Sequence, residues 1–156
     1  MRVRVIAVGA RMPAWVRSAC HEYLTRLERG LPVALSEIEP AARRSGGTVQ
    51  QALALEGERL LGALRPADHV VALDERGTQF STREFAEWLS ARMHSGEDLT
   101  FVIGGPDGLA REVLTRSQLA LSLSRLTLPH ALVRVLLAEQ LYRAHSLLRN
   151  HPYHRD

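Results

Sequence analysis

Lysine is absent from this 156-residue chain, cysteine occurs once, and aromatic residues make up only 5%. A single cysteine, Cys20, excludes an internal disulfide and suits a reducing compartment. Arg11 and Pro13 cut the N-terminal apolar stretch short of a signal peptide, and no run approaches the roughly 20 apolar residues that cross a bilayer. We therefore expect a cytoplasmic protein with no membrane partner.

All 20 strongly basic residues are arginines, and they give a formal net charge of +3 and a sequence pI near 9.7. The planar guanidinium suits phosphate contacts and base stacking. A GC-rich coding bias would produce the same composition, so both explanations stay open. The charge permits an RNA partner without requiring one.

Length and an apolar content of 46% predict one domain, residues 1–156, with a core that needs no disulfide or metal. Apolar runs typical of strands alternate with segments of helical periodicity, which predicts an α/β fold with a mostly parallel sheet. The expected strands are Arg2–Gly9, Leu31–Ile38, Pro66–Asp74 and Leu99–Ile103. The expected helices are 13–29, Val49–Leu64, a helix capped by Ser81 and Glu84 that runs to about His94, Leu109–Ser117 and Pro129–Arg149.

Helical spacing also predicts which side chains point inward. In the first helix these are Trp15, Ala19, Tyr23 and Leu27. In the second they are Leu53, Gly57, Leu60 and Leu64, with Glu56 lying off this face. After the third strand, Glu75-Arg76-Gly77 is expected to turn the chain.

The most informative stretch runs from Phe101 to Arg143. A buried strand there ends in Gly104-Gly105-Pro106-Asp107-Gly108, a loop in which glycine allows a ligand to approach the backbone. The loop matches neither GxGxxG nor the P-loop signature, so on its own it also fits a tight turn. An apolar and hydroxyl-bearing run, Leu119–Leu128, follows and stops at Pro129, a favoured residue at a helix start.

Taken together, GGPDG, LSLSRLTLPH, VRVLLAEQLYRA and the terminal HPYHRD closely resemble the RlmH family. VIAVGARMPAWV and EYLTRL extend the resemblance to the start of the chain, so that it covers nearly the whole length. The family consists of SPOUT-class methyltransferases that use S-adenosylmethionine and act on a pseudouridine of bacterial 23S ribosomal RNA. The resemblance implies a SPOUT-type α/β fold with a C-terminal trefoil knot, which nothing in the periodicity indicates.

The resemblance also implies which residues hold the cofactor S-adenosyl-L-methionine. Leu73 should touch the adenosyl group, and Gly104 and Gly105 should offer main-chain contacts. The loop around the adenine should consist of Leu123, Ser124, Arg125, Leu126, Thr127 and Leu128. Leucines around a flat ring and backbone groups at its edge suit this ligand, although Leu73 and Leu123 would equally suit a plain core.

Methylation of N3 of a pseudouridine must also remove a proton, so a base or a group that stabilises the anion is expected. His130 is a candidate, as are the polar residues of the tail: His151, Tyr153, His154 and Arg155. The tail is either a disordered end or a flap over the active site, and the resemblance favours the flap. His151 and His154 have HxxH spacing, but no further ligand is near, so we expect no metal.

The last helix carries an apolar face wider than packing on one sheet requires, which fits either a buried face or the homodimer that the resemblance implies. Candidate RNA contacts are Arg43, Arg44, Arg134, Arg143 and Arg155. Each arginine has an alternative as a solvated or intrahelically paired side chain, such as Arg143 with Glu139.

The resemblance implies an enzyme that methylates 23S ribosomal RNA in the assembled ribosome. A non-catalytic ribosome-associated RNA-binding factor and a small-molecule methyltransferase are the alternatives.

Overall fold

The computed structural model describes residues 1–42 and 47–155, and its centre is a five-stranded sheet. The strands are β1 (Val3–Val8), β2 (Val33–Ile38), β3 (His69–Gln79), β4 (Leu99–Ile103) and β5 (Leu119–Ser122). They lie in the order β2-β1-β4-β3-β5, and every neighbouring pair in this sheet is parallel. The predicted α/β fold is confirmed, and its sheet is wholly parallel.

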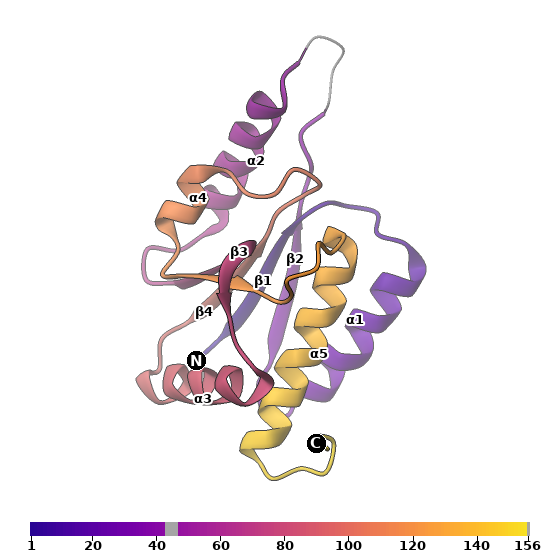
Figure 1. Ribbon diagram of the computed structural model, residues 1–156, viewed down its shortest axis with the longest axis vertical. Helices are drawn as coiled ribbons and strands as arrows, with labels where there is room; N and C mark the ends of the chain where they lie inside the picture. The colour runs from indigo at the N-terminus through magenta and orange to yellow at the C-terminus, as the bar shows by residue number, and fades with distance from the viewer. Residues whose placement is uncertain (43–46, 156) are drawn as a thin grey trace.

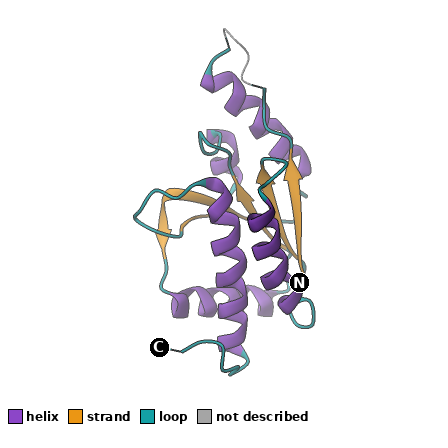
Figure 2. Cartoon of the chain, turned by 90° about the vertical axis from the view of Figure 1, so that its right-hand side faces the viewer, coloured by secondary structure: helices purple, strands orange, loops and turns teal. Residues whose placement is uncertain are grey.

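Helices cover both faces of the sheet (Figures 1 and 2). One face packs against α1 (Ala14–Leu27), α3 (Thr82–Ser95) and α5 (His130–Leu148), and the other against α2 (Val49–Ala63) and α4 (Arg111–Arg116). Strands that are buried on both faces consist mostly of apolar residues. All five residues of β4 are buried, and four of them are apolar. Phe101 packs toward the first group of helices and Val102 toward the second.

Local sequence signals account for the helix boundaries. Ser81 accepts a hydrogen bond from the backbone N–H of Glu84, whose carboxylate accepts one from the Ser81 N–H, so the predicted capping box is confirmed. Gly96 ends the same helix at φ 72°, a left-handed conformation that favours glycine. Pro129 immediately precedes α5, as expected.

Two sequence-based expectations are wrong at the level of single elements. Trp15 is 57% exposed, and α1 buries Val16 and Cys20 in addition to Leu27, the one member of the predicted stripe that is fully buried. Glu56, expected off the inward face of α2, is buried. In both helices the buried face is turned about the helix axis relative to the face that the leucines and aromatic residues predicted.

The third strand does not end in a turn at Glu75–Gly77. It continues to Gln79, and its pairing with β5 is interrupted between Leu73 and Thr78, where the register shifts. Residues 74–77 therefore form a bulge within β3. The trefoil knot that the resemblance implies stays a prediction.

Candidate functional site

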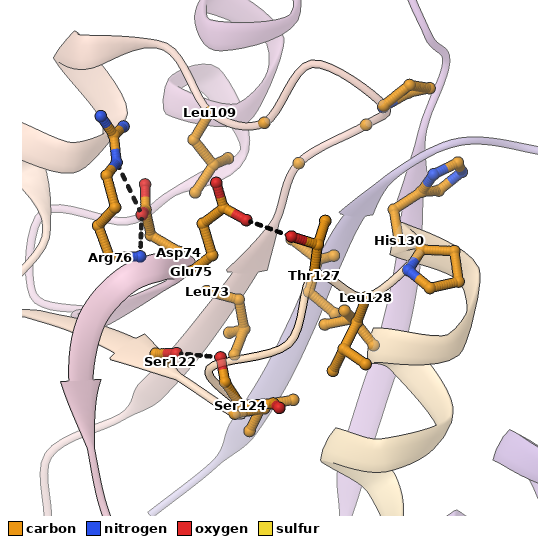
Figure 3. A pocket seen from close by; sticks show the side chains of 18 of the residues that line it. Leu73, Asp74, Glu75, Arg76, Leu109, Ser122, Ser124, Thr127, Leu128 and His130 are labelled. Atoms are coloured by element: carbon orange, nitrogen blue, oxygen red, sulfur yellow. Dashed lines mark hydrogen bonds and ion pairs between the residues drawn. The ribbon is translucent and has the colours of Figure 1, made fainter.

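A cavity of about 590 Å³ lies at the carboxyl edge of β3, β4 and β5 (Figure 3). Because the strands are parallel, the segments that leave β4 and β5 meet here with the bulge of β3. These three segments line the cavity together with the first turns of α5. In open parallel sheets ligands bind beyond the carboxyl ends of the strands, and this volume is in the usual range for small-molecule sites.

The glycine loop after β4 forms one wall. The Gly108 N–H donates to the carbonyl of Gly105 at 3.0 Å, which folds the loop back on itself. A Cβ on Gly104 would lie within 2.5 Å of the Gly108 carbonyl carbon, so this position has no room for a side chain. The loop therefore presents main chain to the cavity, as the sequence predicts.

The bulge of β3 forms a second wall, which the sequence did not reveal. Its Asp74 accepts a hydrogen bond from the Arg76 N–H at 2.8 Å. Glu75 points toward Thr127, whose hydroxyl donates to its carboxylate at 3.3 Å (Figure 3). The bulge is thus tied to the loop that leaves β5, and Asp74, Glu75 and Arg76 line the cavity between them.

The loop after β5 is held by its own hydroxyl groups. Ser122 donates to the carbonyl of Ser124 at 2.9 Å, and the Ser124 hydroxyl accepts from the Leu126 N–H at 2.9 Å. Of the nine residues expected to hold a cofactor, all but Arg125 line the cavity; they are Leu73, Gly104, Gly105, Leu123, Ser124, Leu126, Thr127 and Leu128. Leu126 is nevertheless 74% exposed in this chain.

His130 lines the same cavity from the first turn of α5. Burial lowers the pKa of its imidazole, and the Arg134 guanidinium lowers it further, whereas the Glu56 carboxylate opposes both effects. A lowered pKa keeps the ring neutral and able to accept a proton near neutral pH.

Arg134 does not lie where the sequence suggested. Its side chain is 2% exposed and forms an ion pair with Glu37 at 2.9 Å. The same guanidinium donates to the carbonyls of Val8 and Gly9 at 3.2 and 2.8 Å. It therefore connects α5 to the ends of β1 and β2. The side chain is buried, and it lies neither in solvent nor at a surface that RNA could reach.

The tail is ordered against the C-terminal half of α5. The Tyr153 hydroxyl donates to Glu139 at 3.3 Å, and its ring lies 4.5 Å from that of Tyr142. Burial, hydrogen bonding with Tyr23 and the Glu139 charge raise the pKa of Tyr153 to about 12. At neutral pH this phenol is therefore a donor and not a base.

Within one chain the tail follows the C-terminal end of α5 (Figure 1), whereas His130 at the other end of this helix lines the cavity. At 1.5 Å per residue, His130 and the Glu139–Tyr142 region that holds Tyr153 are separated by roughly 15 Å along the helix. His151, His154 and Arg155 belong to the same distant end of the chain. The structure brings His130 to the cavity but not Tyr153 or His154.

The remaining candidate arginines are dispersed. Arg143 pairs with Glu139 at 2.7 Å, as its spacing predicts, and lies over the Tyr153 ring at 4.9 Å. Arg125 and Arg155 are exposed, while Arg43 and Arg44 lie outside the described residues.

Within residues 1–42 and 47–155, no group of three or more His, Cys, Asp or Glu side chains is placed to hold a metal ion. Nor does any helix among these residues have the length and apolarity to cross a membrane.

A parallel sheet, a glycine loop, a loop held by hydroxyl hydrogen bonds and a histidine of lowered pKa surround one cavity, which has the position and volume of a small-molecule site. The chain belongs to the SPOUT methyltransferase family, because a family profile described as "Predicted SPOUT methyltransferase" matches residues 1–154. It is thus a methyltransferase.

Curated relatives match along their whole length. "Ribosomal RNA large subunit methyltransferase H" of Chromobacterium violaceum is 46% identical over 156 residues, which is 100% of both chains. The protein of that name from Thioalkalivibrio sulfidiphilus is 50% identical over 156 residues, again 100% of both.

Solved structures share the fold at lower identity. A probable methyltransferase from Bordetella pertussis Tohama I has a TM-score of 0.59 at 21% identity, covering 92% of this chain and 94% of its own. A probable methylase family protein from Haemophilus influenzae Rd KW20 has a TM-score of 0.57 at 19% identity, covering 99% and 70%.

Proposed function

We propose that this protein uses S-adenosyl-L-methionine to methylate N3 of a pseudouridine in 23S ribosomal RNA, on the assembled ribosome and therefore in the cytoplasm. The observation that carries the proposal is that eight of the nine expected cofactor residues line one cavity. His130 lines the same cavity. The names of full-length relatives at 46–50% identity support ribosomal RNA as the substrate.

The cavity residues fit the methyl donor chemically. Leu73, Leu123 and Leu128 offer apolar surface for the adenine, and the glycine loop offers backbone groups at close range. When bound, the donor supplies a methyl group on a sulfonium centre. The protein's own contribution is to hold that group and the target nitrogen in line, which can be worth about 7–11 kcal/mol.

The proton on the target nitrogen needs an acceptor, and His130 is the best placed of the candidates. It borders the cavity, and its lowered pKa leaves the ring neutral near pH 7. Tyr153, with a pKa raised to about 12, suits the opposite task of donating a hydrogen bond to an oxygen of the target base.

A homodimer would bring the tail and the cavity together. If two copies of α5 pack antiparallel about a two-fold axis, the end of one helix lies beside the start of the other. Each tail, with Tyr153, His154 and Arg155, would then close over the partner's cavity. The partly exposed Leu132 and Leu136 and the exposed Leu148 supply apolar surface for such packing.

RNA contacts in this proposal come from exposed arginines around the cavity and the tail, chiefly Arg125 and Arg155, with Arg143, Arg43 and Arg44 as further candidates. Phosphate contacts would position the ribosome without reading sequence.

The test of the reaction uses ribosomes from a strain that lacks the gene. They are incubated with the protein and labelled S-adenosylmethionine, and the label is located by nucleoside mass spectrometry. We expect labelled N3-methylpseudouridine. Label on another nucleoside overturns the substrate assignment, and cofactor binding without transfer to any substrate indicates the non-catalytic factor.

The shared site is tested by mixing two inactive chains. One carries Gly104→Ala in the cavity and the other lacks residues 151–156. Coexpressed chains that form heterodimers should regain activity at one site, because one chain supplies an intact cavity and the other an intact tail. Heterodimers that form but stay inactive contradict the shared site.

A further inference from the structure

Glu56 is a buried carboxylate, and one of its two oxygens has no hydrogen-bond partner among the described residues. The residue is 2% exposed. Its Oε1 accepts from the Ala41 N–H at 3.2 Å, while its Oε2 is shielded from solvent and has no partner among the described residues. A buried polar atom without a partner is destabilising, because folding removes its hydrogen bonds with water and replaces them with none. Such groups are rare, and a functional role is one of the accepted reasons for retaining them.

The unused oxygen lies directly behind the cavity wall. A Cβ on Gly105, which lines the cavity, would be 3.6 Å from Glu56 Oε2 and 3.3 Å from Val8 Cγ1. One residue beyond Val8, a Cβ on Gly9 would be 3.8 Å from His130 Nε2 and 3.0 Å from an Arg134 nitrogen. Glu56 from α2 and Arg134 from α5 thus approach the end of β1 from opposite faces of the sheet, with His130 beside them.

We propose that Glu56 is a positioning residue whose buried negative charge supports His130 as the acceptor of the proton that leaves the target nitrogen. This inference rests on the proposed function. Glu56 does not touch the substrate; it acts through the imidazole, much as a buried carboxylate stabilises the imidazolium of a catalytic triad.

The charges around His130 explain why such support is needed. Burial and the Arg134 guanidinium both disfavour the protonated ring, and Glu56 is the group that favours it. Glu37 offsets part of the Arg134 charge through their ion pair. Without Glu56, His130 would still be neutral before the reaction. The imidazolium that forms when it accepts the proton would be less stable.

Glu56 supports the step in which the target nitrogen loses its proton and gains a methyl group. The N3–H bond of the target base breaks, and its proton passes to a ring nitrogen of His130. The N3 electron pair forms the new bond to the methyl carbon, while the electron pair of the broken sulfur–carbon bond stays on sulfur. His130 becomes an imidazolium and the buried carboxylate stabilises it.

A histidine titration followed by NMR tests the electrostatic part without using activity. The His130 ring signal is assigned by its loss in His130→Gln, then titrated in the wild type, in Glu56→Gln and in Glu58→Gln. Glu58 is an exposed residue of the same helix and loses the same charge. We expect a lower His130 pKa in Glu56→Gln alone; an unchanged pKa overturns the proposal.

Glu56→Asp covers the case in which the amide variant does not fold. It keeps the charge but withdraws the carboxylate by one methylene, and it should lower the His130 pKa less. An unchanged His130 pKa in this folded variant overturns the proposal as well.

Activity on ribosomes tests the catalytic part. Glu56→Gln should lower kcat with little change in KM, by less than the roughly 10²-fold or greater loss expected on removing the acceptor itself. The acid limb of its kcat/KM profile should move to lower pH, because the acceptor stays unprotonated to lower pH. A rise in KM alone, with no movement of the limb, overturns the proposal. If wild-type protein methylates no ribosome while the NMR shift is present, the proposed function fails and the electrostatic link does not.

Discussion

Glycine at position 104 is required by backbone packing and not only by the approach of a ligand. Any Cβ there collides with the Gly108 carbonyl, which is main chain and cannot rotate away. The glycine loop keeps its shape only when this position has no side chain.

Gly104→Ala should therefore reshape the cavity wall and abolish measurable binding of S-adenosylmethionine in calorimetry. Gly62→Ala is the matched control, because a Cβ at this helical glycine meets nothing within 4 Å. The control should bind normally and gain up to about 1 kcal/mol in stability. Normal cofactor affinity in Gly104→Ala would contradict the assignment of this cavity.

Arg134 supports the fold around the site, so its removal should be seen first in stability. Arg134→Met leaves the carbonyls of Val8 and Gly9 without their donor, while the 40%-exposed Glu37 side chain can return to water. We expect the free energy of unfolding to drop by about 2–3 kcal/mol in urea denaturation.

Arg17→Met, at an exposed position of α1, is the control and should be close to neutral. An Arg134 variant of wild-type stability that binds ribosomes weakly would restore the RNA-contact interpretation.

The family resemblance predicted much of the cavity, whereas the residue types alone left Leu73 and Leu123 equally suited to a plain core and misplaced the buried charges. The leucines and glycines from Leu73 to Leu128 lie where the resemblance put them, because their apolar and backbone chemistry follows the strand ends. Arg134 and Glu56 were assigned to solvent or to RNA, since charged side chains are rarely buried. Only the tertiary structure reveals that each meets partners from another element.

At the scale of elements, the bulge of β3 shows why turn signals can mislead. Glu75-Arg76-Gly77 reads as a turn, but the chain continues in the same direction and rejoins β5 at Thr78, which pairs with Leu121 as Leu73 does. Gly77 permits this, because a Cβ there would lie 2.6 Å from the backbone of Ala120. The glycine marks a close approach of two strands, which a single sequence does not distinguish from a turn.

Gly77→Ala should separate the bulge from β5. The clash is with main chain, so we expect a loss of stability of about 1–3 kcal/mol and weaker cofactor binding, since Glu75 and Thr127 move apart. Thermal denaturation and calorimetry measure the two effects. Thr127→Val serves as the comparison, because it removes the Glu75 contact without a backbone clash. If Gly77→Ala behaves like Thr127→Val in stability, the backbone contact is not the reason for the glycine.

At the scale of the whole molecule, one buried and two partly buried histidines couple stability to pH. Burial lowers the pKa of His69 and His145, and the neighbouring cations Arg92 and Arg149 lower these values further. His130 is lowered for the same reasons. The folded protein therefore binds fewer protons than the unfolded chain at pH values just below 6.5, the ordinary histidine value.

Stability should accordingly rise with pH through this window and fall as the pH is lowered from 7 to 5. The folded-state pKa values are depressed, so the stabilisation is present above the unfolded value and is lost as the pH drops through the folded ones. Thermal denaturation at several pH values measures the slope. His145→Gln should reduce the slope, whatever its effect on absolute stability. The carboxylates of Glu84 and Asp98, whose pKa values hydrogen bonds lower, add acid sensitivity only at lower pH. A flat profile between pH 7 and 5 would contradict the burial of these rings in solution.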